Sequence, residues 1–159
     1  MQHSDSQTGG TYRSFFITLA ISFVVMYLVM FLNIDRLEHF YLSNTRTYMT
    51  LLMVMPMALI KLIAMRKMYT NKKMNTAIAL GAVLIFLASL AFLRNQTFIG
   101  DEEYMDAMIP HHSSAIMTSQ KAQISDPELK KLAEEIIKAQ EKEIAQMKEI
   151  LERLEGEQH

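Results

Sequence analysis

The chain has 159 residues, half of them apolar, and a formal net charge of −1. The near-neutral total hides a division, because residues 1–100 carry nine Lys and Arg against three Asp and Glu, whereas residues 101–159 carry seven against fourteen. An acidic C-terminal part argues against a nucleic-acid partner, which requires a basic face. The absence of cysteine excludes disulfides and thiolate metal sites. The fourteen methionines are either apolar filler or a source of thioether ligands.

Three long apolar segments predict membrane-spanning helices within residues 1–100, at about 14–32, 47–65 and 76–93. A helix needs about 20 apolar residues to cross the hydrocarbon core, and a slight tilt or local thinning accommodates the difference. The first segment is long for a signal peptide and is not followed by a cleavage site of small residues, so we interpret it as a retained span. Residues 1–100 are therefore expected to form a membrane domain that contacts lipid.

Basic residues in the connecting loops predict the orientation of these spans. The loop between the second and third spans carries four of them, Arg66, Lys67, Lys72 and Lys73. The preceding loop carries only two, and acidic residues offset them. Because cytoplasmic loops are enriched in Lys and Arg, we expect a multi-pass protein of a cell inner membrane with a cytoplasmic N-terminus. Three spans then put the C-terminal part on the periplasmic, extracytoplasmic side.

Residues 101–159 are expected to form a water-soluble helical hairpin. Its first helix should cover about 101–124, and its second should open at Asp126, which can cap the helix with Pro127 in the first helical position. Gly156 should end the second helix. Fewer than 60 residues are marginal for independent folding. We therefore expect a homodimer or homo-oligomer in which two hairpins form a four-helix bundle.

Titratable side chains interrupt the apolar faces of both predicted helices. His112 lies in the middle of one face, and Gln140 and Glu143 lie within the other. A carboxylate in an apolar stripe costs several kcal/mol unless it is paired or metal-bound. One interpretation is a plain core with methionine filler and a buried His112 bonded to Glu143. The other is a soft metal site, because imidazole and thioether suit copper and thioether especially suits Cu(I).

A short motif supports the second interpretation by resemblance. The run Met108-Ile109-Pro110-His111-His112, followed by Ala115 and Met117, resembles the family known as domain of unknown function 305, and so do Gln140, Glu143-Ile144 and Met147 on the second helix. The resemblance covers about residues 101–155 and implies a ferritin-like helical bundle. Similar members are typically bacterial and exported or membrane-anchored, and the best understood bind copper in the periplasm. The sequence departs from the pattern at Ser113 and Ser114, where Gln or Gly is common, and in having a single short hairpin.

We therefore expect an all-α protein with three transmembrane helices followed by a ferritin-like hairpin. Its expected function, which is not enzymatic, is to sequester or transfer copper, with Cu(I) preferred. The expected metal ligands are Met108, His111, His112, Met117, Glu143 and Met147. The alternative is a structural module in which the hairpin drives dimerisation without metal. A di-iron oxidase is disfavoured, because such sites use Glu-x-x-His pairs and the chain has none.

Overall fold

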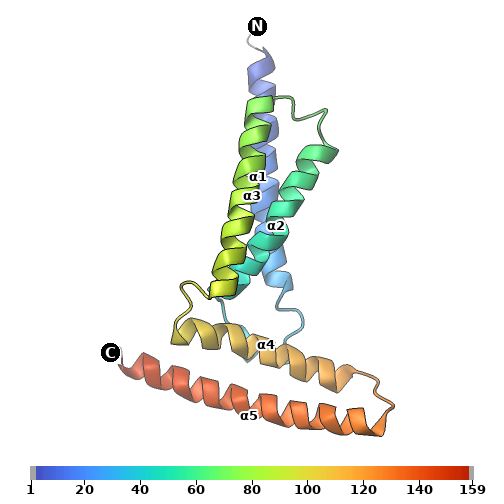
Figure 1. Cartoon of the computed structure of the whole chain (residues 1–159), viewed down its shortest axis with the longest axis vertical. Helices are drawn as coiled ribbons and strands as arrows, with labels where there is room; N and C mark the ends of the chain where they lie inside the picture. Colours follow the sequence, from blue (N-terminus) through green and yellow to red (C-terminus); the bar gives the residue numbers. More distant parts are fainter. Residues whose placement is uncertain (1–2, 158–159) are drawn as a thin grey trace. The chain divides into compact units, whose positions relative to one another are not determined.

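The computed structural model describes residues 3–157, with side chains from Tyr12 onward, and contains five α-helices and a short 3₁₀ helix (Figure 1). The helices are α1 His3–Val29, η1 Leu37–His39, α2 Asn44–Ala64, α3 Lys72–Asn95, α4 Asp101–Lys121 and α5 Pro127–Glu157. No strand occurs within these residues, which confirms the all-α prediction. The chain divides into two compact units, which are described separately below.

The first unit comprises α1 and residues Thr47–Thr97. Its three helices are long and apolar enough to cross a membrane, over Tyr12–Val29, Asn44–Ala64 and Lys72–Asn95, which confirms the number and the approximate bounds of the apolar helices predicted from hydropathy. The third helix begins earlier than expected because the Asn71 side chain accepts a hydrogen bond of 3.1 Å from the backbone N–H of Met74 and so caps it.

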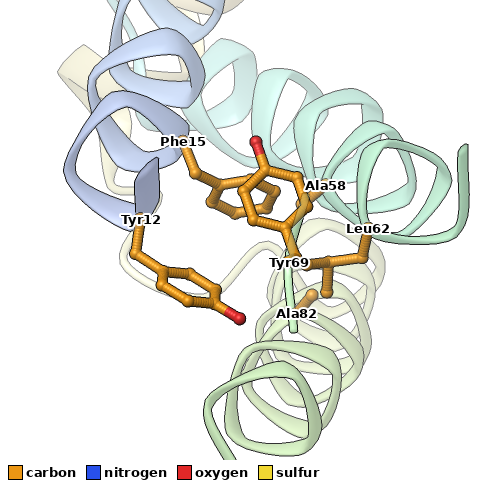
Figure 2. Packing of buried hydrophobic residues seen from close by; sticks show 6 residues of the cluster. All are labelled: Tyr12, Phe15, Ala58, Leu62, Tyr69 and Ala82. Atoms are coloured by element: carbon orange, nitrogen blue, oxygen red, sulfur yellow. The ribbon is translucent and has the colours of Figure 1, made fainter. Parts of the chain in front are cut away.

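Aromatic side chains hold the three spans together at one end of this unit (Figure 2). The ring of Tyr69 lies 5.4 Å from that of Tyr12 and 5.3 Å from that of Phe15, between centroids, and meets Phe15 edge-on. The Tyr12 hydroxyl donates a 2.6 Å hydrogen bond to the side-chain oxygen of Asn75. Buried tyrosines with a polar partner are typical of the membrane interface, where one end of the ring is apolar and the other is wet.

The second unit contains the Met30–Arg46 segment and the hairpin of α4 and α5. Asp126 accepts a 2.7 Å hydrogen bond from the backbone N–H of Leu129, and α5 begins at Pro127, so the predicted start of this helix is confirmed. α5 continues through Gly156 to Glu157 instead of ending before the glycine. α4 runs without interruption through Pro110 and ends at Lys121, three residues before the predicted end.

The hairpin has one apolar core built from residues at helical spacing. Its buried members are Met105, Ile109, Ile116, Ile144 and Leu151. Full burial of an aliphatic side chain of this size stabilises a fold by roughly 1.5–3 kcal/mol. α4 and α5 lie side by side along the hairpin (Figure 1), so this core determines which of their polar residues face each other.

Candidate functional site

A histidine and a glutamate connect the two helices of the hairpin. His112 Nε2 on α4 lies 2.8 Å from Glu143 Oε2 on α5, and His112 Nδ1 lies 2.9 Å from the carbonyl oxygen of Met108, one turn earlier. The His112 side chain is buried, whereas 49% of the Glu143 side chain is exposed. The contact that the plain-core interpretation expected is therefore present.

The positions of the acceptors determine where protons can lie on this pair. A backbone carbonyl can only accept, so His112 Nδ1 carries a proton and donates it to Met108. The contact between Nε2 and Glu143 then needs one further proton, carried by the ring or by the carboxyl group. Without that proton, a nitrogen lone pair and a carboxylate oxygen face each other across a gap that a cation can bridge. Metal-binding histidines usually donate their other ring N–H in this way.

Two methionines lie next to this pair. The contact between His112 and Glu143 sets the register of the antiparallel helices, and residues four apart share a helix face. Met108 precedes His112 by four residues, and Met147 follows Glu143 by four, so the two methionines face each other at the adjacent level of the hairpin. Both are partly buried, and Met147 packs against the apolar core. One face of the hairpin thus offers two thioethers, one imidazole and one carboxylate.

The other two predicted ligands lie on different faces of α4. His111 is exposed, and its ring centroid lies 6.0 Å from that of His112. Met117 follows His112 by five residues, which is about 140° around the helix axis. Among the described side chains, from Tyr12 to Glu157, no three or more histidine, aspartate or glutamate residues are grouped so that they could hold one metal ion. Any metal ion on this face would therefore depend on the thioethers.

Gln140 contributes an unusual polar atom to α5, three residues before Glu143. Its side-chain oxygen is buried and has no hydrogen-bond partner among the residues that the structure describes. Leaving a buried acceptor unsatisfied costs about 1–3 kcal/mol. A proton donor or a cation at this position would remove that cost.

The Met30–Arg46 segment packs on the hairpin through two serines. Ser113, which is fully buried, accepts a 2.7 Å hydrogen bond from the backbone N–H of Asp35, and its Oγ lies 2.9 Å from His39 Nδ1. Asn33 donates a 2.6 Å hydrogen bond to Ser114 Oγ. Ser113 and Ser114 are the positions at which the sequence departs from the motif that it resembles. In this chain, the two serines hold the Met30–Arg46 segment against the hairpin through these hydrogen bonds.

Charged groups also join the Met30–Arg46 segment to the hairpin. Lys148 Nζ lies 3.4 Å from Glu38 Oε1, and a hydrogen bond from this lysine lowers the pKa of Glu38. Burial, followed by the charge of Lys148, lowers the pKa of His39. A cavity of about 300 Å³ lies here, and His39 and Glu38 are among its lining residues. No sequence pattern predicts this cluster, because the only signal in the loop is its charge.

An acidic cluster lies on α4 one turn before the histidines. Burial, followed by the charges of Glu103, Glu102 and Glu155 in that order, raises the pKa of Asp106 to about 6.

These features define a helical protein with three candidate membrane spans and a hairpin that carries a histidine–carboxylate pair beside two methionines. The chain belongs to the family described as "Domain of unknown function (DUF305)", whose family model matches residues 53–151. This match confirms the resemblance and extends from α2 to α5, beyond the hairpin on which the resemblance was based.

One curated relative is an uncharacterized protein of Acanthamoeba polyphaga mimivirus, 45% identical over 56 residues. The alignment covers 34% of this chain and 37% of that protein, so the chain matches little more than a third of the relative's length. No solved structure matches the chain significantly.

Proposed function

We propose that this chain is a membrane-anchored protein whose hairpin binds copper on the extracytoplasmic side and sequesters it or hands it on, without catalysing a reaction. The observation that supports this most directly is the orientation of His112. Its Nδ1–H is engaged by the Met108 carbonyl, so Nε2 is directed toward the second helix, at 2.8 Å from Glu143. A histidine with its ring fixed in this way is prepared to act as a ligand.

The neighbouring side chains favour Cu(I) as the ion. Met108 and Met147 supply soft thioether sulfurs at the adjacent level, and thioethers select Cu(I) over harder divalent ions. Glu143 then acts as a fourth ligand, or it orients the other ligands without binding the metal. Gln140, whose side-chain oxygen has no hydrogen-bond partner among the described residues, lies one turn earlier on α5 and can take either role. His111 is exposed beside His112, so it is available to a second copy of the hairpin.

The proposed assembly is a homodimer in which two hairpins form a four-helix bundle. Leu129, Leu132 and Ile136 of α5 are 49%, 50% and 37% exposed, although they lie at helical spacing. A second copy that covered this stripe would remove apolar area from water. The basic loop between α2 and α3 supports a cytoplasmic location for that loop, and so an extracytoplasmic hairpin.

The copper proposal is tested by measuring Cu(I) affinity of the full chain in detergent, by competition with a colorimetric Cu(I) chelator. Replacing both Met108 and Met147 with Leu nearly conserves core volume. This double variant should bind Cu(I) at least about tenfold more weakly, a loss of about 1.4 kcal/mol. Met105→Leu is the matched control, because Met105 is a buried core methionine one turn earlier. Equal affinities for all three proteins would contradict the proposal.

A structural role without metal is the second candidate. The observation that favours it is that His112 and Glu143 already satisfy each other by a direct hydrogen bond. In that case the purified chain contains no copper. Its thermal unfolding then does not change with Cu(I) or with a chelator, whereas a ligand at 100 times its Kd would stabilise the fold by about 2.7 kcal/mol.

A further inference from the structure

An apolar cavity of about 490 Å³ lies among the three helices of the first unit. We call it the membrane cavity. Its walls include Phe16 and Phe23 of α1, Met55 of α2, and Gly81 and Ile85 of α3. The cavity lies within the size range of small-molecule sites, about 300–1,000 Å³, and an empty apolar space of this size would forfeit many packing contacts. Some apolar group must therefore enter it in the membrane.

The depth of the membrane cavity indicates what that group is. On α3 its lining residues run from Met74 to Ile85, which at 1.5 Å per residue is about 17 Å. This is roughly half of the hydrocarbon core, which is about 30 Å thick. The helix of a second copy would need a groove along the whole span. A cavity that reaches through only one leaflet matches the acyl chain of a lipid.

Positive charge lies at the N-terminal end of α3, next to the Met74 end of the membrane cavity. A shallow hollow, which we call the lysine hollow, is lined by Lys72 and Lys73 together with Thr76, Ala77 and Leu80. Ala77 also lines the membrane cavity, so the two spaces adjoin.

Neither lysine forms an ion pair with any residue from 12 to 157, and both are exposed. The Tyr12–Asn75 hydrogen bond lies at the same end of α3 as the two lysines. Because tyrosines are enriched at the level of the lipid headgroups, we expect this end of α3 to lie at that level.

We propose that the first unit holds one anionic phospholipid, with an acyl chain in the membrane cavity and the phosphate at Lys72 and Lys73. The lipid belongs to the leaflet that carries the loop between α2 and α3. This site is independent of the proposed copper function, since it lies in the other unit of the chain. A basic residue near an anionic membrane surface contributes about fivefold to binding, which makes the two lysines together worth tenfold or more.

The test is lipid retention by the full chain in detergent, measured by native mass spectrometry with added phosphatidylglycerol or with phosphatidylcholine of the same chain length. Gly81→Leu should fill the cavity, because a Cβ built at Gly81 meets nothing within 4 Å. We expect this variant to lose phosphatidylglycerol retention about tenfold. Ala88→Leu is the matched control, since Ala88 is exposed on the same helix and does not line the cavity.

The charge requirement is tested by a second pair of variants. Lys72→Gln with Lys73→Gln should lower the apparent phosphatidylglycerol affinity about 25-fold, because two contributions of about fivefold are removed. Arg66→Gln with Lys67→Gln removes the same charge from the loop before α3, outside the lysine hollow, and should lower retention less than the change at Lys72 and Lys73 does.

Three results would overturn the proposal. The first is equal retention of the two lipids by the parent chain, which would show that no anionic headgroup is selected. The second is an equal loss of phosphatidylglycerol retention in the two charge variants, which would indicate a general electrostatic attraction to basic residues instead of a specific site. The third is unchanged retention in Gly81→Leu together with an altered oligomeric state, which would assign the cavity to a second copy.

Discussion

Replacing Ser113 with Ala should release the Met30–Arg46 segment from the hairpin. The change removes a single oxygen atom, so it creates almost no cavity. It leaves the backbone N–H of Asp35 and Nδ1 of His39 without the partner that Ser113 provides at 2.7 and 2.9 Å. Each buried polar group left unsatisfied costs about 1–3 kcal/mol. Two such groups would together cost about 2–6 kcal/mol, and because one end of this cluster is exposed to water, we expect a loss at the lower end of this range, about 2 kcal/mol.

The adjacent serine provides the control for this experiment. Ser114 accepts a 2.6 Å hydrogen bond from Asn33, but this contact is exposed to solvent. Water replaces an exposed hydrogen bond, so Ser114→Ala should change stability by less than about 0.5 kcal/mol. Both variants remove one hydroxyl oxygen, which is buried with two partners in Ser113 and exposed with one partner in Ser114.

Hydrogen exchange of the backbone amides in the Met30–Arg46 segment measures the effect directly. A loss of 2 kcal/mol for opening the segment corresponds to exchange about 30-fold faster in Ser113→Ala, with little change within the hairpin helices. Equal exchange in the two serine variants would refute the reasoning, because it would show that the segment is held by its other contacts.

Three further predictions follow from other parts of the chain. Folding raises the pKa of Asp106 to about 6, so between about pH 4 and pH 6 the folded hairpin holds a proton that the unfolded chain has lost, and stability falls as pH rises through this window. Asp106→Asn should therefore stabilise the protein at pH 7.5, by about 1 kcal/mol after allowance for solvent screening, and should have no such effect at pH 4 in thermal unfolding. Leu132→Asp should dissociate the proposed dimer in light scattering, because it would bury an unpaired charge, whereas a parent chain that is monomeric at all concentrations would contradict the dimer. Reporter fusions after Lys73 and at the C-terminus should report opposite sides of the membrane, and a cytoplasmic C-terminus would overturn the proposed orientation.

Periodicity in the sequence was sufficient to predict the central pair of the candidate site. His112 and Glu143 each lie inside an apolar helical stripe, and two stripes that bury each other must bring such residues together. The same reasoning cannot place His111 and Met117, which lie about 100° and 140° around the helix from His112. They were expected as ligands only because they belong to the motif that the chain resembles.

Hydropathy and capping residues also determined the three apolar spans and the start of α5, because both depend on residues close together in the chain. Only the tertiary structure revealed how the Met30–Arg46 segment is held. Asp35 and Ser113 are 78 positions apart, and no local pattern marks a contact between a polar loop residue and a helix serine. The membrane cavity was likewise revealed only by the tertiary structure, because its walls come from three helices and its depth depends on how they pack. Local patterns determine which faces are apolar, but the fit between faces depends on side chains that only folding brings together.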